Sequence, residues 1–146
     1  MLDVSKIGFE FPAFEAEVER GRMRLFVKAI GENNPIYLCE EAAKEAGYQS
    51  IPAPPTFMFV LDTEGPELFP FVKVLDMDIG KILHGSQEFE YFGMIYAGDK
   101  IAIRSTIKDI YAKKNGQLEF VVIENSYTNQ DNVLVGKTTN TLVYRN

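Results

Sequence analysis

One short segment constrains the fold of this chain more than any other. The run TFMFVL begins at Thr56, is almost entirely apolar and directly follows Pro54 and Pro55. Proline suits the first turn of a helix, because its missing amide hydrogen would have had no partner within the helix. The segment therefore predicts a helix that begins at about Thr56 and continues toward Gly65. A helix that is apolar on every side must be covered on every side, so we expect it in the centre of the protein.

The chain before this segment has the pattern of helices and loops. Residues 16–31, AEVERGRMRLFVKAIG, place apolar side chains three and four positions apart, which predicts an amphipathic helix that ends at Gly31. The following Asn-Asn-Pro sequence predicts a loop, and the Glu/Ala/Lys run before Gly47 predicts a short helix. Residues 66–80 show no clear period and are interpreted as an irregular connector.

The chain after Lys81 has the pattern of strands. Gln87, Phe89 and Tyr91 alternate along one segment, and the later segments LEFVVIENSYT and VLVGKTTNTLVYR are rich in β-branched and aromatic residues. Turn signals separate these segments at residues 97–99, 114–116 and 129–132. The pattern predicts four long strands in a meander.

An apolar helix followed by such a sheet indicates the α+β class. It is compatible with a hot-dog architecture, in which a curved antiparallel β-sheet wraps around a central helix, and also with other α+β folds. The 146 residues suffice for one core and contain no repeat or linker, so we expect a single domain spanning residues 1–146. The free edges of such a sheet favour pairing with a second chain.

Composition excludes several functions. The net charge is −6 and the basic residues are scattered, which argues against a nucleic-acid partner. No apolar run could span a membrane and no secretory signal is evident, so we expect a soluble, cytoplasmic protein. One cysteine, Cys39, and one histidine cannot build a zinc cluster, and no metal or redox cofactor is implied. An anionic ligand would need a basic patch, but a solvated role is favoured for the four candidates Lys81, Arg104, Lys113 and Lys114.

Three stretches together resemble a known family. ERGRMRLFVKAIGENNPIY, IPAPPTFMF and LHGSQEFEYFGMIYAGDKI are similar, in this order, to the amino-terminal MaoC-like dehydratases, also called FAS1-like dehydratase domains. The resemblance implies a hot-dog fold and acyl substrates carried as thioesters on coenzyme A or acyl carrier protein. It also implies reversible removal of water from a 3-hydroxyacyl chain, usually with R stereochemistry.

The chemistry of that reaction needs a base, an acid and donors for the thioester oxygen. Active hydratases of this superfamily supply the base and the acid from an Asp-x-Asn-Pro-x-His motif. The matching stretch here runs from Glu32 to Tyr37, so Asn34 and Pro35 are kept while both catalytic positions differ. Glu32 still offers a carboxylate, but a phenol near pKa 10 such as that of Tyr37 is a poor base at neutral pH.

The start of the central helix differs from active hydratases as well. They carry a glycine there whose amide faces the thioester oxygen, whereas this chain has Pro55, which has no N–H. The amide of Thr56 or Phe57 could take that role. His84 and Gly85 match the family's own Leu-His-Gly stretch, which favours a substrate-lining or structural role over a general base. The candidate catalytic residues are Glu32, Tyr37 and His84, and the candidate substrate-binding residues are Asn34, Pro55, Thr56, Phe57 and Gly85.

Three functional hypotheses remain open. The leading one is a 3-hydroxyacyl dehydratase or 2-enoyl hydratase component, with this chain as the substrate-holding subunit of a dimer and a MaoC-like partner supplying the missing Asp and His. The second is a thioesterase that uses Asp62 or Glu64, although their place near the helix end favours a solvent-facing role. The third is a non-catalytic acyl-binding module. The aromatic residues Phe57, Phe59, Phe89 and Tyr91 are most simply core, though some could line an acyl tunnel.

Overall fold

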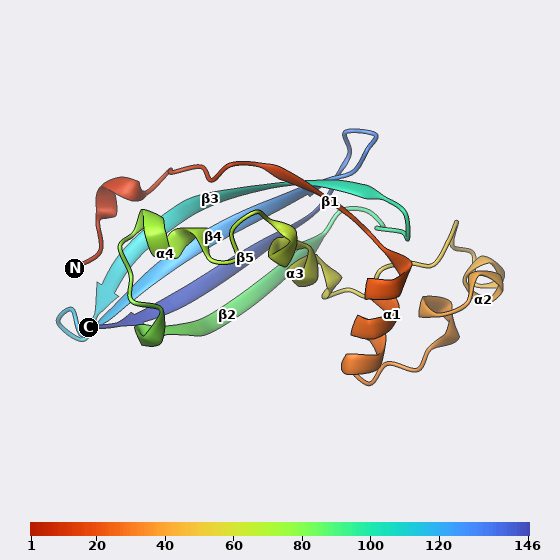
Figure 1. Ribbon diagram of the computed structural model, residues 1–146, viewed down its shortest axis with the longest axis horizontal. Coiled ribbons are helices and arrows are strands. Elements are labelled where there is room, and N and C mark those ends of the chain that lie inside the picture. The colour runs from red at the N-terminus through yellow and green to blue at the C-terminus, as the bar shows by residue number, and fades with distance from the viewer.

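One curved antiparallel sheet dominates the computed structural model, which describes all 146 residues, Met1–Asn146 (Figure 1). Its strands are β1 (Phe14–Glu17), β2 (Ile82–Tyr91), β3 (Lys100–Lys113), β4 (Leu118–Thr128) and β5 (Leu134–Arg145). The strand order is β1-β3-β4-β5-β2, and every neighbouring pair is antiparallel. The predicted α+β class is therefore confirmed.

The helical elements are short and fall into two groups. Those of the amino-terminal half are η1 (Val4–Lys6), α1 (Arg20–Ala29), η2 (Pro35–Tyr37) and α2 (Glu40–Glu45); those that follow are α3 (Phe57–Leu61), η3 (Asp62–Glu64), α4 (Pro70–Val74) and η4 (Ile79–Lys81). In Figure 1, α1 and α2 lie beyond one end of the sheet, while α3 and α4 lie along one of its faces. The helices are all too short to cross a membrane.

The predicted four-strand meander is wrong for β2. β3, β4 and β5 form consecutive hairpins, but β2 pairs with β5, from Ile82 opposite Tyr144 to Tyr91 opposite Gly136. The sequence pattern of a strand is the same whichever neighbour it pairs with. The eight residues between β2 and β3 carry the chain across the end of the sheet, so that β2 becomes the edge strand next to β5.

Two further expectations need correction. The helix predicted for residues 16–31 begins only at Arg20, because Ala16 and Val18 alternate inward and the stretch before the helix joins the sheet as β1 beside β3. The connector predicted for residues 66–80 contains α4 and η4, and Pro70 occupies the first turn of α4. The predicted end of the first helix is confirmed, because Gly31 follows it with a φ of 72°.

The central helix is shorter and less enclosed than predicted. α3 has five residues and continues as the single turn η3. Phe57, Met58 and Leu61 are buried against the sheet, as the apolar pattern requires. Phe59 points to the other side and is 43% exposed. Complete coverage of this helix was therefore a wrong prediction for the single chain.

A glycine on β5 allows α3 to approach the sheet closely. A Cβ at Gly136 would lie 2.5 Å from Met58 Sδ and 3.0 Å from the backbone oxygen of Glu90. The first contact is with a flexible side chain, but the second is with the backbone of the neighbouring strand. Any side chain at position 136 therefore pushes α3 away from the sheet or separates β2 from β5.

We expect Gly136→Ala to lower the free energy of unfolding by about 1–3 kcal/mol, the usual cost of overpacking a core. Gly21→Ala is the matched control, because Gly21 lies in α1 with open space around it. This control should raise the free energy of unfolding by up to about 1 kcal/mol, since alanine has the higher helix propensity. Urea unfolding of both variants tests the idea, and a Gly136→Ala protein as stable as wild type would contradict it.

The inner face of the sheet is apolar at both ends and polar in the middle. One apolar cluster surrounds α3 and includes Ile103 and Tyr127, and a second lies toward the chain termini and includes Ile107 and Leu142. Between the clusters, four polar residues occupy adjacent inward positions on three strands; we call them the polar band. They are Ser105, Asn125, Thr138 and Asn140.

Candidate functional site

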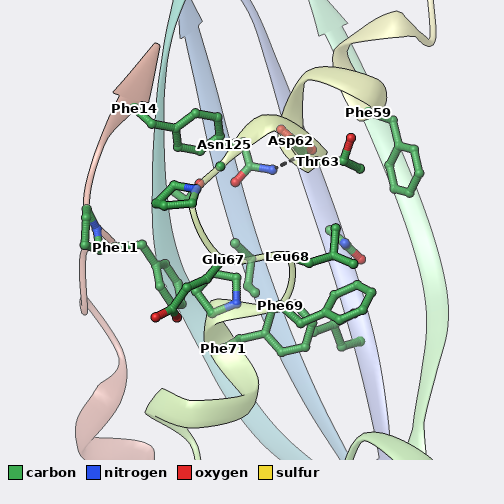
Figure 2. A pocket seen from close by; sticks show the side chains of 18 of the residues that line it. Phe11, Phe14, Phe59, Asp62, Thr63, Glu67, Leu68, Phe69, Phe71 and Asn125 are labelled. Atoms are coloured by element: carbon green, nitrogen blue, oxygen red, sulfur yellow. Dashed lines mark hydrogen bonds between the residues drawn. The ribbon is translucent and has the colours of Figure 1, made fainter. Parts of the chain in front are cut away.

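A cavity of about 500 Å³ lies over the polar band. Its walls are mostly apolar and come from the amino-terminal segment, the stretch between α3 and α4, and the sheet (Figure 2). The aromatic lining residues are Phe11, Phe14, Phe59, Phe69 and Phe71. The volume is in the range of pockets that enclose small organic ligands.

A hydrogen-bonded network closes the side of the cavity next to α3. The Tyr127 hydroxyl donates to Asp62 Oδ1 at 2.6 Å, and Asn125 Nδ2 donates to Asp62 Oδ2 at 3.1 Å, the bond drawn in Figure 2. Thr138 Oγ1 joins the network 2.9 Å from the Tyr127 hydroxyl and 3.2 Å from Asn125 Nδ2. The carboxyl group of Asp62 is thus held by two donors from β4.

Burial shifts both acids of this network toward their neutral forms. It raises the pKa of Asp62 from 3.8 to about 7, although the hydrogen bonds from Tyr127 and Asn125 oppose the shift. Burial, followed by the charge of Asp62, also raises the pKa of Tyr127, so this phenol stays protonated and donates. The network therefore holds a carboxyl group that changes charge near neutral pH beside an apolar cavity.

The two acids considered for a thioesterase have different surroundings. The expectation that Asp62 faces solvent is wrong, because the turn η3 directs it toward the inner face of the sheet, where it lines the cavity. Glu64, two residues later, forms an ion pair with Arg22 of α1 instead. Only Asp62 can act on a ligand in the cavity.

His84, on the edge strand β2, lines the same cavity. Its Nε2 lies 3.2 Å from Gln87 Oε1, and its ring centroid lies 6.0 Å from that of Phe59. Gly85 is not a cavity-lining residue. A Cβ at Gly85 would lie 2.8 Å from the backbone oxygen of Thr141, so this glycine serves the bulge where β2 approaches β5.

The motif loop is held by its own side chains. Glu32 Oε1 accepts hydrogen bonds from the amides of Asn33 and Asn34, both at 2.8 Å, and Asn34 Oδ1 accepts from the amide of Ile36 at 3.1 Å. Burial, and next the charge of Glu32, raises the pKa of Tyr37. The Glu32 carboxylate is therefore engaged in local structure, and the Tyr37 phenol is an even poorer base than an exposed one.

The structure does not bring the three catalytic candidates together within one chain. Tyr37 borders a separate hollow of about 310 Å³ beside Arg20, Arg24 and Cys39. This hollow lies at the α1 and α2 end of the molecule, whereas His84 lies near the beginning of β2, at the opposite end (Figure 1). Cys39 is half-buried, with its Sγ 3.0 Å from Glu41 Oε2.

The backbone at the start of α3 leaves one amide free. The amide of Phe57 donates to the carbonyl oxygen of Pro54 at 2.9 Å, so of the two amides considered above only that of Thr56 has no hydrogen bond within the chain. The carbonyl oxygen of Pro55 accepts from the Tyr91 hydroxyl at 2.8 Å. Of the substrate-binding candidates in this segment, Phe57 serves the core and Thr56 offers a donor.

Sequence reasoning missed Asn125, Tyr127, Thr138 and Asn140. One signal was available in the segment LEFVVIENSYT, where Asn125 is in phase with the inward residues Val121 and Ile123. A polar side chain at a position reserved for the core indicates a function or a buried network.

Comparison with known proteins identifies the family. The family model described as FAS1-like, dehydratase domain region matches residues 5–138. A UPF0336 protein of Saccharopolyspora erythraea is 34% identical over 145 residues, 99% of this chain and 92% of that protein. A UPF0336 protein of Streptomyces avermitilis is 37% identical over 110 residues, 75% of this chain and 73% of that protein.

A solved structure agrees with this assignment. A chain of the C-terminally truncated HadBC (3R-hydroxyacyl-ACP dehydratase) complex of Mycobacterium tuberculosis is 30% identical and superposes with a TM-score of 0.79. The match covers 94% of this chain and 96% of that chain. The hot-dog fold expected from the resemblance is thereby confirmed, and the chain belongs to the FAS1-like dehydratase domain family.

Proposed function

We propose that this chain is the acyl-binding subunit of a dehydratase or hydratase that acts on (3R)-hydroxyacyl or 2-enoyl thioesters of coenzyme A or acyl carrier protein. The observation that carries the proposal is a contrast within one chain. The apolar cavity of about 500 Å³ is present, while both catalytic positions of the motif are replaced, by a Glu32 carboxylate held in local structure and by a Tyr37 phenol with a raised pKa. In this proposal the chain holds the acyl group, in the cytoplasm, and a second subunit performs the proton transfers.

The division of labour follows from the chemistry of dehydration. A base must remove the proton next to the thioester carbonyl, and an acid must protonate the leaving hydroxyl. Tyr37 cannot supply the base near neutral pH, because its pKa is raised above that of an ordinary phenol. Glu32 holds the amides of Asn33 and Asn34. A partner with an intact Asp-x-Asn-Pro-x-His motif supplies both groups.

The outer edge of the sheet supports pairing with such a partner. β2 is ten residues long and hydrogen-bonds only to β5, so its other edge has free amide and carbonyl groups. Large apolar side chains on this strand and just after it are exposed: Leu83, Tyr91, Phe92 and Met94. The solved relative is itself described as a complex, HadBC. A heterodimer with a MaoC-like catalytic subunit is our first expectation, and a homodimer is the alternative.

The test compares the chain alone with the chain plus a partner that carries the intact motif. Alone, it should bind dodecanoyl-CoA but hydrate 2-enoyl-CoA no faster than buffer does. The mixed complex should hydrate the substrate, and its KM should rise when the cavity is altered. Turnover by the isolated chain that disappears in Glu32→Ala or His84→Ala would refute the proposal and identify a self-sufficient hydratase.

Binding to the cavity has its own prediction. Leu68 lines the cavity and is largely exposed, so Leu68→Asp should leave folding intact while it places a charge where the acyl chain binds. We expect dodecanoyl-CoA to bind at least about tenfold more weakly, the equivalent of one lost buried leucine contact. Leu25→Asp, on an exposed residue of α1 outside the cavity, is the control and should leave binding unchanged. Equal loss in both variants would mean that the acyl chain binds elsewhere.

Acyl-thioester hydrolysis is the second candidate, and the position of Asp62 in the cavity favours it. A carboxylate there could activate water against a thioester. We expect little hydrolysis, because Asp62 already accepts two hydrogen bonds and is about half protonated near pH 7. Release of free coenzyme A that is lost in Asp62→Asn would reverse the order of the two candidates.

A further inference from the structure

The polar band poses a problem for an acyl-binding cavity. An unsubstituted alkyl chain would lie against the amide groups of Asn125 and Asn140 and remove them from water without replacing the lost hydrogen bonds. Desolvation of an unpaired amide costs about 1–3 kcal/mol. A cavity that served only unbranched hydrocarbon would be expected to have aliphatic residues at these positions, as the sheet has on both sides of the band.

The band offers one unpaired acceptor to the cavity, the side-chain oxygen of Asn125. Asn125 Nδ2 is used by Asp62 and Thr138, which fixes the orientation of the amide and leaves Asn125 Oδ1 without a partner. Asn140 Oδ1 has no partner either, but it is buried too deeply to face the cavity, and Asn140 lies opposite Gln87 of β2. Gln87 Nε2 is unpaired as well, but Gln87 does not line the cavity.

We infer that the cavity takes acyl chains that carry a hydroxyl group well beyond the thioester, and that Asn125, positioned by Asp62, accepts the hydrogen bond of this hydroxyl. The inference rests on the proposed function and narrows its substrate class. A hydroxyl can donate to Asn125 Oδ1, whereas a keto group at the same carbon has no hydrogen to donate. A site that uses its buried polar groups in this way discriminates against ligands that lack the hydroxyl.

The hydroxyl concerned is separate from the one that dehydration removes. The free amide of Thr56, the donor that the proposed function offers to the thioester oxygen, lies at the start of α3, and Asp62 follows the last residue of this helix. At 1.5 Å per residue, Asp62 is roughly 8 Å further along the helix axis than Phe57. The band therefore contacts the acyl chain several carbons beyond the reacting end.

The experiment measures binding to the wild-type chain by displacement of a fluorescent fatty-acyl probe. The ligands are dodecanoyl-CoA, a series of hydroxydodecanoyl-CoAs with the hydroxyl at different carbons beyond the third, and the matching keto compounds. One or two adjacent hydroxy isomers should bind about tenfold tighter than the plain chain, the equivalent of one buried hydrogen bond. The keto compounds should bind no tighter than the plain chain.

Two variants test whether the polar band causes the tighter binding of the hydroxy isomer. Asn125→Leu should abolish the preference for the hydroxy isomer and bind plain dodecanoyl-CoA at least as well as wild type does. Ser105→Ala is the control, because it also alters the band but leaves the Asp62 and Asn125 pair intact, and it should retain the preference. A preference retained in Asn125→Leu would overturn the inference.

The outcomes for wild type separate this inference from the proposed function. If plain, hydroxy and keto chains bind equally well, the inference is wrong while acyl binding stands. If no acyl-CoA displaces the probe, the proposed function fails as well. Hydrolysis of the ligands that disappears in Asp62→Asn would also overturn the inference, because the band would then be part of a hydrolytic site.

Discussion

Phe57→Ala should lower the free energy of unfolding by about 3–5 kcal/mol, the usual cost of removing a buried phenylalanine. The Phe57 ring is only 1% exposed and packs edge-on against Phe26 with centroids 5.6 Å apart. It also anchors α3, which is too short to be stable without its contacts to the sheet. We expect a loss of this size to be a large part of the total stability of a domain of this length.

Phe59→Ala is the matched control, because it changes the same residue type on the same helix. Phe59 is 43% exposed and faces the cavity, so its removal should change the free energy of unfolding by at most about 1 kcal/mol. It should instead weaken acyl binding. Urea unfolding and acyl-CoA binding, measured on both variants, test the distinction. Equal destabilisation by the two substitutions would show that the exposed side of α3 is part of the core.

The free energy of unfolding should fall by up to about 3 kcal/mol between pH 5 and pH 8 because of Asp62. The folded state raises the pKa of this carboxyl from 3.8 to about 7, so between these values the folded protein binds more protons than the unfolded chain. Stability then decreases as pH rises through this window and levels off above pH 7. The contribution is fully present only below about pH 4.

Asp62→Asn should remove most of this dependence, because an amide does not titrate. The new amide can still accept from Asn125, while the Tyr127 hydroxyl turns to donate to Thr138 at 2.9 Å. His84 and Glu67 line the same cavity and stay in place as titratable neighbours in both proteins. Urea unfolding at several pH values compares them. A wild-type slope that survives in Asp62→Asn would mean that another group causes the pH dependence.

Local patterns in the sequence were enough to predict the class of the fold and most of its helices and strands. The β-branched and aromatic residues of β4, the turn residues around 98, 115 and 132, and the apolar run after Pro55 are all features of neighbouring residues in the chain. The structure confirms the strands and turns that they predict. The sequence could not predict which strand pairs with β2. Its pairing with β5 depends on how the chain crosses the sheet rather than on the residues of the strand itself.

The candidate site divides in the same way. The resemblance to the family motif, which is read along the chain, predicts from the sequence alone that Glu32 and Tyr37 stand at the two catalytic positions. Only the tertiary structure decided that Asp62 faces inward and meets Tyr127, 65 residues away, over an apolar cavity. The raised pKa of Asp62 comes from burial, and burial is set by the packing of α3 against distant strands, which no local pattern records.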